Sequence, residues 1–525
     1  MNRYVLLLFT FLSYSSLQAQ ELKFTTEWGE QLRAPRNSSL DDIIGYDASG
    51  IYTIKKRGKS SYTLEHYDKK FSLTGSFDLD IEEEGYQCTV QSLLQLKGNI
   101  YMIYSYANNQ QKKRKLLVTM IDKKTLRPSG EKKKVGEIDF SGNPRYNSGY
   151  FDIRVSRDSS KVLVQYGLPL KTNEPQQFGF NVLDNQFASL WEKSVTLPYK
   201  ESLFDIVLTR VDNQGNVYLL GRIYKEKHKE KRRGIPNYSY EVFACRNKGN
   251  STAQYPVILE DRFITDMQIE ILDNTNIICA GFYSAQGTTS IAGTYFLTID
   301  AESKAVKTKS FKEFGIDFIT ENLKEVQVNR AIRKEKKGKD TELFEYDLDK
   351  LLVGKDGSAI LIGEQYYVET TTSTSYSSGG SNMRSITYHY YYNDIIAVKI
   401  NPEGQIEWTQ KVAKTQHTSD DDGFYSSYSL AIVKGKICFI FNDNPENLAR
   451  KDTDVGRPEN FRVGKSVVVI VSLDQNGKET KQPVFSSADV DVITRPKVCE
   501  QISNNTVILF GQRKKEQQFA KITFQ

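Results

Sequence analysis

The feature that most constrains the fold of this chain is a short motif that recurs along its whole length. Each copy is an apolar strand pattern, a tight turn rich in Asp, Asn, Gly or Lys, and a second apolar strand pattern. Runs of β-branched and aromatic residues bounded by turn residues predict paired β-strands. The eight copies cover residues 43–56, 92–105, 153–166, 207–222, 269–282, 350–365, 429–442 and 499–512.

A second hairpin pattern follows the first within each unit. Clear examples are residues 178–195, 394–412 and 466–485. Four antiparallel strands repeated along a chain are the signature of a β-propeller. We therefore predict an all-β fold, a β-propeller of eight four-stranded blades with seven as the alternative. Residues 21–525 are expected to form it as one domain.

The last unit lacks a fourth strand, because the chain ends after residues 519–524 (FAKITF). Residues 22–28 (LKFTTEW) supply a candidate for that strand. The chain has three tryptophans, and Trp191 and Trp408 both lie in predicted fourth strands, so Trp28 fits the same position. We expect the N-terminal strand to complete the last blade, which would leave no open sheet edge where the ends of the chain meet.

Some repeats are similar to known propeller repeats. Residues 211–221 (VDNQGNVYLLG) resemble the secreted β-propeller repeat of bacteria, with its Asp, Gly-Asn-Val-Tyr and trailing Gly. Residues 404–408 (GQIEW) resemble quinoprotein-type repeats. The whole chain resembles uncharacterised exported bacterial propellers with no assigned activity. The resemblance implies the fold and transfers no function.

Residues 1–20 have the layout of a secretory signal peptide. Arg3 gives a positive start, residues 5–12 (VLLLFTFL) form a short apolar run, and Ala19 lies where cleavage is expected. The run is too short to span a bilayer, and no later segment is long enough either. A buried first strand is the alternative. We expect an exported protein, periplasmic or extracellular, with no transmembrane segment.

Charge and special residues exclude several classes of function. A net charge of +6 over 525 residues gives no case for a nucleic-acid partner. The five cysteines form no CxxC motif, and Cys245, Cys279 and Cys438 lie in apolar strand patterns, which predicts core packing instead of disulfides. No zinc-binding or nucleophile motif occurs. We predict no metal, no cofactor and no catalytic residue.

The long insertions are predicted to gather on one face of the propeller. With strands lettered A to D outward from the axis, A–B and C–D turns lie on one face and B–C and D–A connections on the other. The A–B turns are tight, whereas the long segments are B–C or D–A loops. These are residues 225–239, 314–345, 368–393, 415–427 and 442–464. Long loops on a rigid scaffold commonly carry binding sites; neutral loop growth is the alternative.

The loop predicted over residues 368–393 combines Ser, Thr and Gly with tyrosines. Tyrosine offers a large contact area at a low entropy cost. The candidate ligand-binding residues in and beside it are Tyr366, Tyr367, Tyr376, Tyr388, Tyr390, Tyr391 and Tyr392. Two other interpretations stay open: a Ser/Thr tip without function, and alternating tyrosines that simply begin the next strand.

Five aspartates recur just before strand A of their units and are predicted to surround the mouth of the axial channel. They are Asp42, Asp152, Asp205, Asp266 and Asp347. Convergent carboxylates can hold a cation or an amine. Alternatively, each carboxylate accepts hydrogen bonds from backbone amides of a neighbouring blade.

These observations favour a non-enzymatic binding or scaffolding propeller at the cell envelope. It would engage a protein or glycan through the face that carries the long loops. The alternative is a propeller enzyme, a hydrolase or lyase, that acts on an envelope glycan through the strand-A aspartates.

Overall fold

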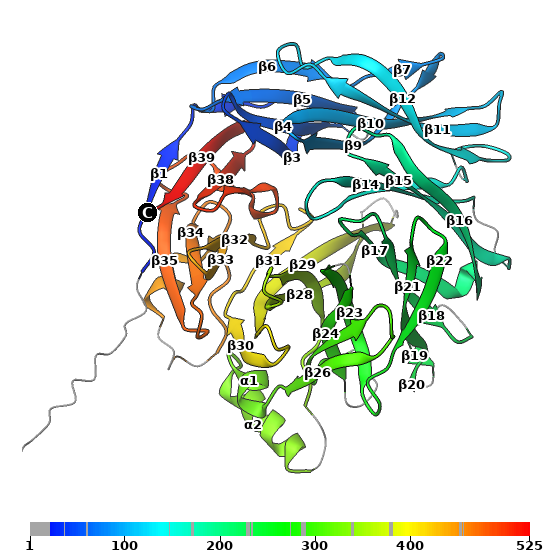
Figure 1. The fold of residues 1–525 in the computed structure, drawn as a ribbon. Helices are drawn as coiled ribbons and strands as arrows, with labels where there is room; N and C mark the ends of the chain where they lie inside the picture. The colour runs from blue at the N-terminus through cyan, green and yellow to red at the C-terminus, as the bar shows by residue number, and fades with distance from the viewer. Residues whose placement is uncertain are drawn as a thin grey trace, which may run out of the picture.

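Antiparallel sheets account for nearly all of the regular secondary structure (Figure 1). The computed structural model describes residues 21–525 apart from 36, 59–60, 146, 170–172, 227–230, 233–234, 274, 285–289, 338–340, 377–381, 451–453 and 455. The predicted signal peptide, residues 1–20, lies outside the described residues. Within the described part, no helix is long and apolar enough to cross a membrane.

Each repeat unit forms one sheet, and we number the sheets 1 to 8 in chain order of their first strands. In sheets 1 to 7 the main strands follow one another in chain order. Sheet 1 consists of β3 (Ser38–Asp47), β4 (Gly50–Arg57), β5 (Ser61–Asp68) and β6 (Leu73–Asp78). Sheet 2 consists of β9 (Thr89–Leu96), β10 (Asn99–Asn108), β11 (Lys113–Ile121) and β12 (Pro128–Asp139). Sheet 3 consists of β13 (Tyr150–Val155), β14 (Lys161–Gly167), β15 (Pro175–Asp184) and β16 (Ser189–Lys200). Sheet 4 consists of β17 (Phe204–Val211), β18 (Val217–Tyr224), β21 (Tyr238–Arg246) and β22 (Ser251–Val257).

The second half of the chain repeats this pattern. Sheet 5 consists of β23 (Phe263–Leu272), β24 (Asn276–Ser284), β25 (Gly293–Asp300) and β26 (Val306–Glu313). Sheet 6 consists of β27 (Tyr346–Val353), β28 (Ala359–Tyr376), β29 (Asn382–Ile400) and β30 (Ile406–Val412), with β31 (His417–Ser419) added beside β29. Sheet 7 consists of β32 (Ser429–Val433), β33 (Lys436–Asp443), β34 (Val467–Leu473) and β35 (Glu479–Ser486).

Sheet 8 combines both ends of the chain. Short strands β36 (Ile493–Thr494) and β37 (Glu500–Ser503) pair with β38 (Thr506–Arg513), and β38 pairs with β39 (Glu516–Phe524). On its other side β39 pairs with β1 (Phe24–Trp28) and β2 (Leu32–Arg33). Phe24 lies opposite Phe524 and Trp28 opposite Ala520, and Figure 1 shows blue β1 beside red β39.

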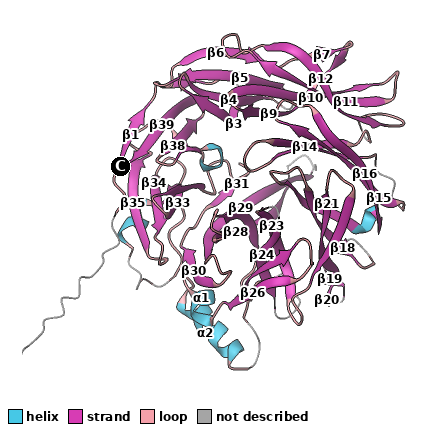
Figure 2. Ribbon diagram, viewed as in Figure 1, coloured by secondary structure: helices cyan, strands magenta, loops and turns pink. Residues whose placement is uncertain are grey.

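The connections hold the remaining elements. Two small hairpins pair β7 (Glu82–Glu83) with β8 (Tyr86–Gln87) and β19 (Lys231–Arg232) with β20 (Ile235–Pro236). The connection between sheets 5 and 6 contains helices α1 (Ile316–Thr320) and α2 (Glu325–Glu335), at the edge of the molecule in Figure 2. Short 3-10 turns are η1 (Glu201–Leu203), η2 (Pro445–Ala449) and η3 (Pro496–Val498).

The middle strands of the sheets are apolar on both faces, so each sheet needs a neighbour on either side. Strand β34 (VVVIVSL) is buried at every position, and β33 is buried at all positions but its first. The described core divides into eight hydrophobic clusters, each shared by two successive sheets. The cluster that joins sheet 8 to sheet 1 includes Phe510, Phe519, Leu40 and Tyr67. This arrangement of four-stranded sheets around an axis is that of a β-propeller.

Cysteines contribute to this core as the sequence predicts. Cys245, Cys279, Cys438 and Cys499 are buried, Cys88 is partly buried, and all five are free thiols. Burial raises the pKa of the Cys279 thiol to about 12, so it stays protonated and apolar in character.

The contacts of β1 generate a stability prediction. The Trp28 ring packs edge-on against Phe485 of sheet 7, with ring centres 4.6 Å apart. We expect Trp28→Ala to lower the free energy of unfolding by about 2 kcal/mol, because it removes part of the packing between sheets 7 and 8. Deleting residues 22–28 should cost more, since it also exposes the edge of β39. Thermal and urea denaturation measure both effects.

Thr25 provides the matched control, since it lies on the exposed face of the same strand. Thr25→Ala should change stability by less than about 0.5 kcal/mol. A truncated protein that unfolds at the same temperature as the full chain would contradict any structural role for β1.

Candidate functional site

The segment predicted as a Tyr-rich loop is instead a long two-stranded ribbon. Strands β28 and β29 extend beyond sheet 6 and stay paired from Tyr366 opposite Tyr392 to Tyr376 opposite Asn382. The loop prediction was wrong because Thr and Tyr favour extended backbone. Here each residue from 366 to 376 pairs with one from 392 back to 382. We call residues 366–376 and 382–392 the tyrosine hairpin; residues 377–381 lie outside the described part.

Pairing distributes the candidate tyrosines over both faces of the tyrosine hairpin. Tyr367 lies opposite Tyr391 on one face, and their rings stack with centres 4.5 Å apart. Tyr366 lies opposite Tyr392 on the other face, with ring centres 4.6 Å apart. These four tyrosines form the base of the hairpin, where their rings pack in pairs, so a structural role accounts for some of the candidate tyrosines.

Further out, one face of the tyrosine hairpin is exposed and apolar. The pairs Val368–Tyr390, Thr370–Tyr388 and Thr372–Ile386 follow one another on the face that begins with Tyr366 and Tyr392. Val368, Ile386 and Tyr388 are exposed by 41%, 55% and 45%. Tyr376 pairs with Asn382 through its backbone, and its side chain lies outside the described residues.

The opposite face of the hairpin carries two histidines that the sequence analysis did not combine. His417, on β31, stacks on Tyr391 with ring centres 4.4 Å apart. Its Nε2 lies 3.2 Å from Nδ1 of His389. Burial and the nearby His389 lower the pKa of His417. The added strand β31 makes this contact, and no spacing in the sequence reveals it.

A buried lysine fixes the base of the hairpin. Lys414 Nζ donates to Glu364 at 2.7 Å, to the Tyr392 carbonyl at 2.7 Å and to Gln416 at 3.1 Å. Neither Lys414 nor Glu364 is accessible to more than a few per cent. The lysine is fully hydrogen-bonded, which accounts for its burial and gives it a positioning role.

A second carboxyl group lies beside this pair. Asp349 accepts a hydrogen bond of 2.7 Å from Tyr428, which directly precedes β32. Burial and the neighbouring Glu364 carboxylate raise the pKa of Asp349 to about 7. The sequence analysis missed Asp349, Glu364 and Lys414, because only the pairing of β27 with β28 and the D–A connection bring them together.

The five predicted aspartates lie within the first strands of their sheets, not just before them. The expected positions were therefore wrong by a few residues, because β3, β13, β17, β23 and β27 each begin earlier than their apolar pattern does. Their partners also differ. Asp152 pairs with Arg154 at 3.1 Å, and Asp42 accepts from the Ile43 amide at 2.8 Å.

Asp266 fits the interpretation that these carboxylates accept hydrogen bonds from backbone amides of a neighbouring blade. Its two oxygens accept from the Met267 amide at 2.8 Å and from the Leu348 amide of sheet 6 at 3.1 Å. Burial nevertheless raises the pKa of Asp266 to about 6. Burial also raises the pKa of Asp42, and burial with nearby Glu345 and Glu364 raises that of Asp347.

Asp205 and Asp266 line one pocket together. This pocket of about 520 Å³ also contains Arg222, whose guanidinium lies 3.3 Å from Asp205, and Tyr240. Tyr224 donates to Asp205 at 3.1 Å. The two carboxyl groups in this pocket thus have different surroundings. Asp205 lies next to the Arg222 guanidinium, whereas Asp266 accepts hydrogen bonds from backbone amides and is shielded from water.

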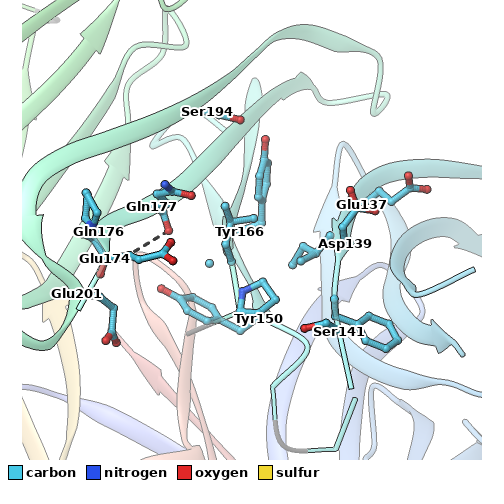
Figure 3. Close-up of a pocket in the computed structure, with 16 residues that line it drawn as sticks. Glu137, Asp139, Ser141, Tyr150, Tyr166, Glu174, Gln176, Gln177, Ser194 and Glu201 are labelled. Atoms are coloured by element: carbon cyan, nitrogen blue, oxygen red, sulfur yellow. Dashed lines mark hydrogen bonds between the residues drawn. The ribbon is translucent and has the colours of Figure 1, made fainter. Parts of the chain in front are cut away.

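A neighbouring pocket of about 560 Å³ shares Tyr150, Gln176 and Glu201 with this one. Figure 3 shows Tyr150 and Tyr166 between Glu137 on one side and Glu174 and Glu201 on the other. Both pockets lie at the B–C and D–A ends of their strands. We call them together the acidic groove, which runs over sheets 2 to 5.

Glycines allow the two tyrosines to lie flat in this groove. A Cβ on Gly167 would come within 2.1 Å of the Tyr150 ring, and one on Gly179 within 2.1 Å of the Tyr166 ring. Among the described residues, no group of three or more His, Cys, Asp or Glu side chains is placed to hold a metal ion.

Comparisons with known proteins add little. No family model and no curated protein matches the sequence. Similar solved structures include the WD40 domain of SCAP from fission yeast, 8% identical over 95% of this chain and 94% of that chain, with a TM-score of 0.42. Another is prolyl oligopeptidase B from Galerina marginata, 10% identical over 92% of this chain and 56% of that chain, with a TM-score of 0.38. At these scores neither likeness carries an argument, and the propeller assignment rests on the sheets and their clusters.

The raised pKa of Asp266 generates a prediction. The folded state holds this proton more tightly than the unfolded state does, where the pKa is 3.8. Its contribution to stability is therefore complete below about pH 4 and is lost as the pH rises through about 6. Asp266→Asn should flatten the decline in unfolding free energy between those values, measured by urea denaturation.

Gln268→Ala on the same strand is the control, because it removes a polar side chain that does not titrate. Its pH profile should run parallel to that of the wild type. Parallel profiles for Asp266→Asn and the wild type would show that Asp266 is not the titrating group.

Proposed function

We propose that this chain is a non-enzymatic binding or scaffolding propeller whose B–C and D–A face engages a protein or glycan at the cell envelope. One observation carries the proposal. The tyrosine hairpin presents Val368, Ile386 and Tyr388 to solvent on one face of a paired, extended ribbon. Exposed apolar and aromatic side chains gathered on an ordered scaffold are typical of interaction sites.

The surroundings of the hairpin support this assignment. Its base is anchored by Lys414 and by the Tyr367, Tyr391 and His417 stack, so its outer part is held in position before any partner arrives. A preorganised surface loses less conformational entropy on binding than a mobile loop does. The acidic groove on the same face offers carboxylates and tyrosines to a partner's amines or hydroxyl groups.

The same proposal includes eight blades, a ring closed by β1, and export from the cell. Eight shared clusters and the pairing of β1 with β39 support the ring. The layout of residues 1–20 supports export to the periplasm or the cell exterior, as in the exported bacterial propellers that the sequence resembles.

One observation favours the enzyme alternative. Asp205 lies beside Arg222, and Asp266 has its pKa raised to about 6, in a single pocket. Glycan hydrolysis needs one ionised and one protonated carboxyl group. Against this, both oxygens of Asp266 already accept backbone amides, which favours a structural role.

Photo-crosslinking tests the binding function. A photoreactive amino acid at Thr372, on the exposed apolar face, should capture an envelope protein or glycan in intact cells. The same group at Asn476, in the C–D turn of sheet 7, serves as control, because it lies on the other face of the propeller. Equal capture from both positions would contradict the proposal.

A shortened hairpin tests the same function by affinity. Replacing residues 371–387 by Asn-Gly keeps the Thr370–Tyr388 pair and supplies a two-residue hairpin turn. We expect unfolding within about 1 kcal/mol of the wild type, and at least tenfold weaker binding of the captured partner. A collapse of stability would show that the ribbon is structural.

The enzyme alternative has its own test. We expect purified protein to release no product from envelope glycan libraries. Turnover that disappears in both Asp205→Asn and Asp266→Asn, while Asp152→Asn retains it, would replace the binding function by a hydrolase or lyase.

A further inference from the structure

A pocket lies at the opposite end of the axis from the tyrosine hairpin. It has a volume of about 470 Å³, and its lining comes from the A–B ends of β13, β17, β27 and β32 together with β23. Because the first strands of five sheets contribute, this axial pocket lies between blades and not within one. Its size is within the roughly 300–1,000 Å³ of small-molecule sites.

Three arginines line the axial pocket. They are Arg154 of β13, Arg157 in the turn after β13, and Arg210 of β17. Arg157 donates from Nη2 to the carbonyl of Val353 in sheet 6 and so reaches across the axis. Each guanidinium has five N–H donors, and the contacts given for these three arginines use only one or two each.

Charge balance in the axial pocket favours a monoanion. Arg154 pairs with Asp152 at 3.1 Å, and Arg210 pairs with Glu270 at 3.3 Å. Counting these two carboxylates against the three guanidinium groups leaves one positive charge. A carboxylate carries one negative charge and matches the planar fork of arginine, whereas a phosphate monoester near neutral pH carries nearly two.

The rest of the lining is apolar. Leu351, Leu352 and Val353 of β27 form one wall, and Ile432 of β32 adjoins it. Leu352 and Ile432 are partly exposed, so a ligand that covered them would gain hydrophobic contact. The pocket therefore combines cationic groups on sheets 3 and 4 with a hydrocarbon surface on sheets 6 and 7.

We propose that the axial pocket binds a small amphipathic carboxylate. Its carboxylate lies among Arg154, Arg157 and Arg210, and its hydrocarbon part lies against Leu352 and Ile432. The proposal is independent of the function assigned to the tyrosine hairpin, because the axial pocket and the hairpin lie on opposite faces of the propeller and share no residue.

Isothermal titration of the full-length mature protein with octanoate tests this inference. We expect saturable one-site binding of octanoate, at least tenfold weaker binding of octanol, and no displacement of octanoate by inorganic phosphate. Octanol that binds as well as octanoate would show a purely hydrophobic pocket. Displacement by phosphate would show a general anion site. Either result, or the absence of saturable octanoate binding, overturns the proposal.

Variants then locate the site. Arg210→Gln should weaken octanoate binding about tenfold, because it removes one charged donor. Glu270→Gln should tighten binding about threefold, because it removes a competing carboxylate from Arg210. Arg330→Gln, on exposed helix α2, is the matched control and should have no effect. If Arg210→Gln does not fold stably, Glu270→Gln alone tests the site. Octanoate binding to Glu270→Gln that is unchanged or weaker would contradict the placement of the carboxylate beside Arg210.

Discussion

The burial of both faces of the middle strands is the interaction on which the rest of this structure depends. Strands such as β34 have no polar face to turn toward water. A sheet of this kind is stable only between two neighbours, so the eight clusters support one another in series. Where the first and last strands meet, β39 has β1 on its outer side, and Phe510 and Phe519 pack against sheet 1.

Pockets at the two ends of the first strands differ in charge, although each holds groups of both signs. The pocket at the B–C and D–A ends contains Asp205, Asp266 and Arg222. The axial pocket at the A–B ends contains three arginines and Glu270, which pairs with Arg210. Carboxylates therefore predominate at one end of the strands and guanidinium groups at the other.

Much of the fold was predictable because it depends on local pattern. The eight hairpins, the tight A–B turns and the place of Trp191 and Trp408 in fourth strands follow from apolar periodicity and turn residues. Residues 368–393 were predicted as a loop because Ser, Thr and Gly also suit loops. The alternative left open, tyrosines that begin the next strand, holds for Tyr388, Tyr390, Tyr391 and Tyr392 in β29.

The sites were less predictable because they depend on contacts between distant segments. Lys414 meets Glu364 across 50 positions, and Arg157 meets Val353 across 196. No spacing rule connects such residues. The pKa of Asp266 illustrates the same limit, because the Leu348 amide that Asp266 accepts comes from sheet 6, 82 positions away in the chain.

Native-state hydrogen exchange tests the central claim most directly, namely that the first strand is an integral part of the ring. In increasing urea, amides in peptides that cover Phe24–Trp28 should exchange with the same free energy and the same urea dependence as those that cover Glu516–Phe524. Both should approach the values of β34. Rapid exchange of the first strand, independent of urea, alongside a protected β39 would show a frayed terminus and contradict the account.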